Sequence, residues 1–166
     1  MSEKLAISKA TGPHYKLNLL AGGWEGSTSV WFGPDTLADH SPVKGTMRPV
    51  LDGRFILHEY KGSFGGEPLE GMAFIGYHLA LEKYQMAWID SFHNGAAMMF
   101  CDGTKGNDKL SVLGSYAWVT PEIEQHWGWR TEIEMNDEDE IVITAYNISP
   151  EGEEVKATET IYKRVK

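Results

Sequence analysis

The sequence predicts an all-β protein, in which about ten antiparallel strands form an up-and-down meander that closes into a barrel after one short N-terminal helix. Short runs rich in β-branched and aromatic residues recur roughly every 8 to 14 residues. Gly, Asn, Asp and Pro separate these runs at positions typical of tight turns. A sheet of about ten strands usually curls and closes, because closure removes the two unpaired edges that promote aggregation.

The single helix is predicted over residues 13–21. Pro13 suits the first position of a helix, and Gly22 and Gly23 are typical stop signals after the leucine-rich stretch that follows it. The preceding residues, 1–12, are expected to form a flexible segment.

The strands follow from the turn signals. Asp52-Gly53, Gly65-Gly66 and Asn94-Gly95 have the composition of hairpin turns between neighbouring runs. No repeat or linker divides the chain, so residues 1–166 are expected to form one domain. The predicted strands are residues 24–32, 43–51, 55–64, 69–78, 84–93, 96–101, 109–119, 127–135, 140–148 and 154–165.

Charge and composition narrow the range of partners. Lys and Arg total 15 against 24 Asp and Glu, a formal net charge of −9, which disfavours nucleic acid as a partner. No apolar run approaches the roughly 20 residues that span a bilayer, so no membrane partner is expected. The residues from Met1 to Thr11 lack the pattern of a secretory signal, so a cytoplasmic location is expected. Whether it forms a homodimer stays open.

Metals and cofactors have little support in the sequence. Cys101 is the only cysteine, which excludes a disulfide framework and a cysteine-rich metal site. The histidines on the predicted strands and turns show no local ligand spacing. We therefore expect neither a metal nor a cofactor.

The strand patterns predict which side chains face the barrel interior. Alternation in 127–135 places Trp127 and Trp129 on an apolar face, and alternation in 84–93 places Trp88 and Asp90 together. These tryptophans are expected to point inward, where they either line a pocket or fill a core.

Three charged residues share a strand face with apolar neighbours. They are Arg48, Glu59 and Asp90, and charges inside a barrel must be paired or bind a ligand. We expect these residues, with Trp88 and Trp129, to form a ligand-binding site. Two alternatives remain: structural ion pairs that hold the strand register, or a solvent-facing position.

Gly22-Gly23-Trp24 opens the first predicted strand and Tyr162-Lys163-Arg164 lies on the last. This combination resembles the calycin superfamily, which includes lipocalins and fatty-acid-binding proteins. The resemblance implies that Arg164 covers the Trp24 indole at the closed end of a lipocalin-like barrel, through a cation–π contact.

A second set of motifs extends over residues from about 15 to 164. It comprises Trp24 with Gly26, Arg48, Gly53-Arg54-Phe55, Glu59-Tyr60-Lys61-Gly62, Glu70-Gly71, Gly76-Tyr77 and Trp88-Ile89-Asp90-Ser91. These motifs resemble those of the bacterial family of unknown function DUF1579, with one departure, because His78 stands where the family usually has Asp. The resemblance implies a lipocalin-like barrel and no settled activity.

The leading functional hypothesis is a barrel that binds a small, partly apolar molecule. An alternative is an enzyme on the same barrel, with Asp90 or Glu59 as a carboxylate general acid or base. A filled barrel with a structural or interaction role is the third hypothesis, and it predicts no cavity.

Overall fold

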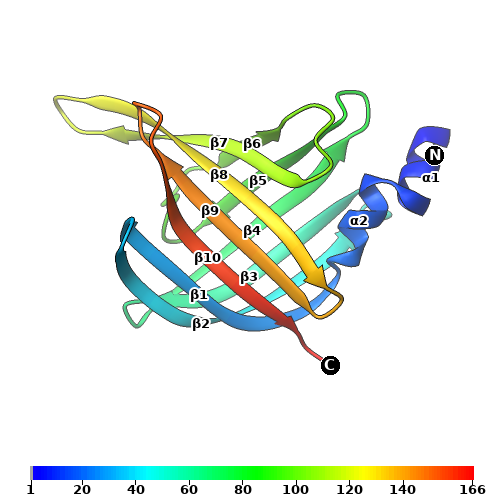
Figure 1. Ribbon diagram of the computed structural model, residues 1–166, viewed down its shortest axis with the longest axis horizontal. Coiled ribbons are helices and arrows are strands. Elements are labelled where there is room, and N and C mark those ends of the chain that lie inside the picture. Colours follow the sequence, from blue (N-terminus) through cyan, green and yellow to red (C-terminus); the bar gives the residue numbers. More distant parts are fainter. Residues whose placement is uncertain (1) are drawn as a thin grey trace.

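Ten strands joined mostly by short turns form one closed antiparallel barrel in the computed structural model, which describes residues 2–166. Each strand pairs with the next in sequence, and β1 pairs with β10 to close the barrel (Figure 1). The all-β barrel prediction is confirmed. The strands are β1 (Gly22–Gly33), β2 (Thr36–Val50), β3 (Phe55–Phe64), β4 (Glu67–His78), β5 (Lys83–Asp90), β6 (Met99–Gly103), β7 (Leu110–Val119), β8 (Glu124–Asp137), β9 (Glu140–Ile148) and β10 (Glu154–Arg164).

Two helices precede the barrel, where one was predicted. Helix α2 (Pro13–Leu19) begins at Pro13 as expected. Helix α1 (Glu3–Thr11) lies in the segment for which only a flexible chain was expected. The Ser2 hydroxyl caps α1 by accepting a hydrogen bond from the Leu5 amide at 3.3 Å. Its apolar residues follow no clear helical period, which explains why sequence patterning missed it.

The helices lie at one end of the barrel, and two of the hairpins lie at the opposite end. In Figure 1, α1 and α2 lie at one end, and the β1–β2 and β7–β8 hairpins lie at the other. We call these the closed end and the mouth. The connection between β5 and β6, residues 91–98, also lies at the mouth. The strands alternate in direction, so β5 runs the same way as β1 and ends at the same end of the barrel.

Strand β5 is shorter than the sequence predicted. It ends at Asp90 rather than at His93, and the connection to β6 is longer than the predicted Asn94-Gly95 turn. The Asp90 carboxylate accepts a hydrogen bond from the Asn94 amide at 2.8 Å, which turns the chain away from the β5–β6 ladder. A local side-chain contact therefore overrides the alternating pattern.

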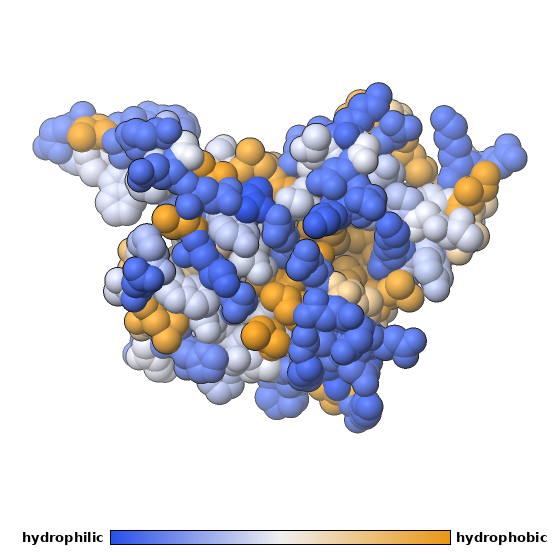
Figure 2. All heavy atoms as spheres, in the orientation of Figure 1, coloured by the Kyte–Doolittle hydropathy of each residue, from blue (hydrophilic) through white to orange (hydrophobic). Residues whose placement is uncertain are grey.

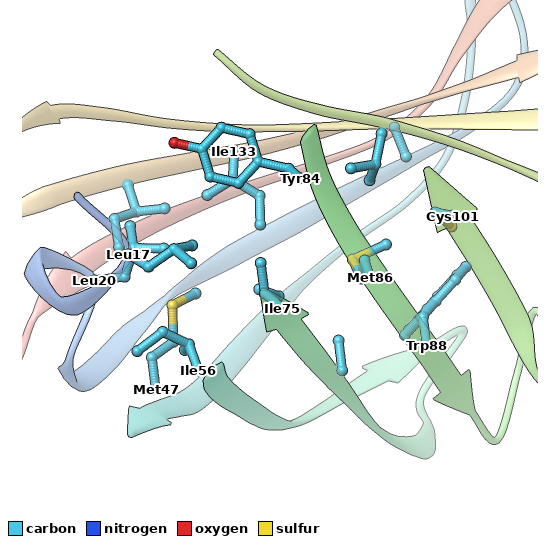
Figure 3. Packing of buried hydrophobic residues seen from close by; sticks show 14 of the residues in the cluster. Leu17, Leu20, Met47, Ile56, Ile75, Tyr84, Met86, Trp88, Cys101 and Ile133 are labelled. Atoms are coloured by element: carbon cyan, nitrogen blue, oxygen red, sulfur yellow. The ribbon is translucent and has the colours of Figure 1, made fainter. Parts of the chain in front are cut away.

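The hydrophobic core fills the barrel from the closed end. Leu17 and Leu20 extend from the helical segment toward Met47, Ile56 and Ile75 on the strands (Figure 3). Farther along the barrel, Met86 and Trp88 from β5 and Cys101 from β6 continue the same cluster. Hydrophilic residues cover much of the outer face in view in Figure 2, with hydrophobic atoms exposed in its recesses. Because this core occupies the closed end, a ligand-binding site inside the barrel would lie near the mouth.

Candidate functional site

The closed end is sealed by one tryptophan and one arginine. Trp24 on β1 is buried, and its Nε1 donates to the Leu20 carbonyl at 3.0 Å. The Arg164 guanidinium lies 4.2 Å from the centre of the Trp24 ring, and its Nη1 donates to the Ala21 carbonyl at 2.6 Å. The structure thus contains the contact that the calycin resemblance implied. It excludes water from the end of the barrel that carries the helices.

A cavity of about 110 Å³ lies inside the barrel toward the mouth. Its apolar walls include Trp88, Trp129 and Met86, and the two indoles stack with ring centres 5.7 Å apart. Its polar walls include the hydroxyls of Thr28, Thr131, Thr158 and Thr160. The predicted inward orientation of Trp88 and Trp129 is therefore correct.

Tyr60 crosses this interior at the junction of β3, β4 and β5. Its register neighbour Gly71 has no side chain, and an added Cβ there would overlap the Tyr60 hydroxyl. Trp88 Nε1 donates to that hydroxyl at 2.9 Å. The glycine of the Glu70-Gly71 motif therefore makes room for the tyrosine of the Glu59-Tyr60 motif, and Trp88 holds the ring in place.

Asp90 anchors the loop of residues 91–98, which we call the mouth loop. Its side chain is 0% exposed, and its Oδ2 lies 2.6 Å from His93 Nδ1. Its Oδ1 accepts the Asn94 amide. The His93 ring is thereby held 5.5 Å from the Trp88 ring and 5.3 Å from the Trp129 ring. One buried carboxylate thus fixes an imidazole against the aromatic wall of the cavity.

A second polar pair lies deeper in the barrel. His58 Nε2 and the Tyr162 hydroxyl are 3.3 Å apart. Burial lowers the pKa of His58 to about 4, so the imidazole is neutral at pH 7. Burial also raises the pKa of Tyr162 well above its usual range. The pair is therefore uncharged, and it can offer hydrogen bonds without an ionic group.

Two of the expected site residues face solvent, which corrects the assignment of their strand faces. Arg48 on β2 and Glu59 on β3 have side chains 58% and 43% exposed, and they pair on the outer surface with Arg48 Nε 3.4 Å from Glu59 Oε2. The reason is that β3 carries apolar residues on both faces. Ile56 faces the interior, while Leu57 shares the outer face with Glu59 and is still buried. Asp90 does face the interior, but its partner is His93 rather than Arg48.

A larger hollow of about 1040 Å³ lies on the outer side of β2–β5, beside the mouth loop. It is open to solvent and its rim carries Lys44, Glu59, Lys61 and Glu70. Tyr60 and Asp90 line both this hollow and the interior cavity. The hollow is too open to enclose a ligand, but it adjoins the cavity where these two residues lie.

Sequence reasoning missed His58, Tyr60 and His93 as parts of the site. His58 and Tyr60 were overlooked because the other face of their strand appeared to be the inner one. Gly71 in the middle of β4 is a signal that could have identified Tyr60, because a glycine inside a strand often marks the close approach of a large neighbour. Nothing in the sequence indicated that Asp90 would bring His93 back over the barrel.

The cysteine has the properties of a packed hydrophobic residue. Cys101 is buried on β6, and burial raises the pKa of its thiol to about 12, chiefly by desolvation. Among residues 2–166, no three His, Cys, Asp or Glu side chains are grouped so as to hold a metal ion. Within that same range, no helix combines the length and the apolar character needed to cross a membrane.

Comparisons with known proteins identify a family and two solved structures of low similarity. A family profile described as "Protein of unknown function (DUF1579)" matches residues 9–164. No curated protein matches the chain. A de novo designed fluorescence-activating β-barrel is similar, with 15% identity, coverage of 87% of this chain and 93% of that chain, and a TM-score of 0.45. A protein of unknown function of the DUF3598 family from Nostoc punctiforme PCC 73102 has 8% identity, coverage of 90% and 98%, and a TM-score of 0.22.

Proposed function

Since the chain belongs to the DUF1579 family, whose description assigns no activity, we propose from the site geometry that this protein binds a small, partly apolar molecule inside its barrel. The observation that carries the proposal is the cavity of about 110 Å³ between the Trp88–Trp129 wall and the threonine hydroxyls. Ligand sites are typically concave and mostly apolar, with a few convergent polar groups, and this interior has both features.

The cavity also argues against a filled barrel. Ala73 and Ala145 line the cavity, and a filled barrel would be expected to carry larger side chains at such positions. An empty cavity of this volume costs about 3 kcal/mol of folding free energy at 24 cal/mol per Å³. A bound molecule would offset that loss, because its atoms would restore the missing packing contacts.

The cavity volume limits the size of the bound molecule. Pockets for drug-sized ligands usually measure roughly 300 to 1,000 Å³. An engineered protein cavity of about 150 Å³ holds one benzene molecule. With about 110 Å³ available and an open mouth, the molecule is on the order of a single ring.

The enzyme alternative receives less support from the same geometry. Both Asp90 oxygens already accept hydrogen bonds from the mouth loop, and Glu59 is paired with Arg48 on the outer surface. Neither carboxylate is placed as a free general acid or base beside the cavity. Binding without reaction is therefore the function that we propose.

Calorimetric titration with toluene, an uncharged single-ring probe, tests the proposal. The wild-type protein should bind toluene, and Ala73→Leu should weaken binding by about tenfold or more, because the added carbons occupy cavity space beside Trp88, its register partner. Ala117→Leu adds the same atoms at an exposed position on β7 and should leave affinity unchanged. Absence of toluene binding to the wild-type protein, together with native mass spectra showing no retained small molecule, would refute the proposal.

A further inference from the structure

In the part of the chain that the structure describes, no Lys or Arg side chain lines the cavity to pair with a bound anion. Among the described residues, Asp90 is its only acidic lining residue, and no Lys, Arg or Glu lines it. The two histidines of the lining do not fill that role. His93 is engaged by Asp90, and His58 is buried and neutral beside Tyr162. A carboxylate or phosphate entering this space would lose its hydration, lack a countercharge and approach the Asp90 carboxylate.

Tyr60 provides a hydrogen-bond donor that the described part of the protein does not use. Its hydroxyl oxygen accepts from Trp88 Nε1, but its hydrogen has no acceptor among residues 2–166. A phenol carries one donor hydrogen, so this hydrogen is available to an acceptor atom in the cavity, which Tyr60 lines. Burial and the nearby Asp90 charge raise the pKa of Tyr60 far above neutral pH, so this hydrogen stays in place.

Two independent features therefore limit the chemistry of the ligand. The absence of a countercharge in the lining favours an uncharged molecule, and the free hydrogen of the Tyr60 hydroxyl favours a molecule with a hydrogen-bond acceptor. The geometry points to an uncharged, single-ring compound with a hydrogen-bond acceptor, bound between the Trp88–Trp129 wall and the threonines, with the Tyr60 hydroxyl donating to that acceptor. This inference rests on the proposed function and assigns the ligand class and the residue that selects it.

Three probes that share one ring test the inference: toluene, benzonitrile and benzoate. Toluene has no acceptor, benzonitrile has an uncharged acceptor, and benzoate has an anionic one. We expect the wild-type protein to bind benzonitrile about three- to tenfold more tightly than toluene, which is the value of one net hydrogen bond. Benzoate should bind at least about tenfold more weakly than benzonitrile, because its charge is not compensated in the cavity.

Tyr60→Phe identifies the donor. The variant should lose the preference for benzonitrile, so that the ratio of the benzonitrile and toluene affinities falls to about one. Tyr116→Phe is the matched control, because it removes a tyrosine hydroxyl that already donates to Asn147 Oδ1 at 2.8 Å and lies outside the cavity lining, so it should keep the ratio. Reading the ratio within each variant cancels any general change in cavity shape.

The infrared frequency of the nitrile bond tests the hydrogen bond in the wild-type protein, without a variant. This frequency rises when the nitrile nitrogen accepts a hydrogen bond, so benzonitrile bound to the wild-type protein should show a shift to higher frequency. Benzoate binding most tightly, an unshifted nitrile band, or an unchanged affinity ratio in Tyr60→Phe would overturn the inference. Toluene binding would still support the proposed function in those cases, whereas failure of toluene to bind would remove both.

Discussion

Replacing Asp90 with alanine should release the mouth loop and destabilise the fold. Asp90 is fully buried and accepts two hydrogen bonds from the loop, at 2.6 Å from His93 and 2.8 Å from the Asn94 amide. A hydrogen bond to a charged group contributes about 1.5 to 3 kcal/mol. Losing both should lower the free energy of unfolding by roughly 3 to 6 kcal/mol. Asp90→Asn keeps an oxygen for the Asn94 amide, so it should lose roughly half as much.

Urea unfolding followed by circular dichroism measures this loss, and amide hydrogen exchange over residues 91–98 measures release of the loop. Asp102→Ala is the control, because Asp102 also has two side-chain partners, Lys83 and Gln85, but lies on the outer surface. It should cost less than about 1 kcal/mol. If Asp90→Ala behaves like Asp102→Ala and the loop amides stay protected, Asp90 does not anchor the loop and the reasoning fails.

Two further predictions concern the buried histidine and the closed end. Because burial lowers the pKa of His58 from 6.5 to about 4, the unfolded chain binds a proton that the folded one does not, and stability should fall by about 3 kcal/mol as pH drops from 6.5 to 4. In His58→Gln, the urea midpoint should depend less on pH across this range than in the wild-type protein. His126→Gln, which changes an exposed histidine, is the control and should show the wild-type pH dependence. Arg164→Lys should lower the unfolding free energy by roughly 1 to 3 kcal/mol, because an ammonium cannot contact the Trp24 ring and the Leu19, Ala21 and Glu138 carbonyls together. Lys163→Ala, which changes a neighbouring exposed cation, is the control, and equal midpoints for Arg164→Lys and the wild-type protein would contradict the assigned role.

The strand order was predictable because it depends on local signals. Turn residues such as Gly65 and Gly66 adopt positive φ angles of 56° and 86°, which glycine tolerates, and they end β3 where the sequence indicated. The inward side of β8 was equally clear, because Arg130, Glu132 and Glu134 alternate with the apolar residues Trp129, Ile133 and Met135 in its middle.

The site was only partly predictable because its polar residues do not follow the hydrophobic pattern. His58 and Tyr60 occupy inner positions of β3, whereas Leu57 is apolar, buried and on the outer side. If apolar residues are assumed to face the interior, Leu57 places the wrong face of β3 inside the barrel, and Glu59 is then predicted to point inward. The position of His93 depends on the hydrogen bonds of Asp90, which no periodicity encodes.

The pairing of β1 with β10 has a consequence for how the chain folds. Every other strand pair joins neighbours in sequence, whereas this seam joins the two strands that are farthest apart, so its closure carries the largest loop entropy and should come late. Until then both strands have free edges that could pair with another molecule. The edge of β1 carries Ser27, Thr28 and Ser29, and that of β10 carries Glu159 and Lys163. These hydroxyls and charges disfavour pairing of either free edge with another molecule before the seam closes.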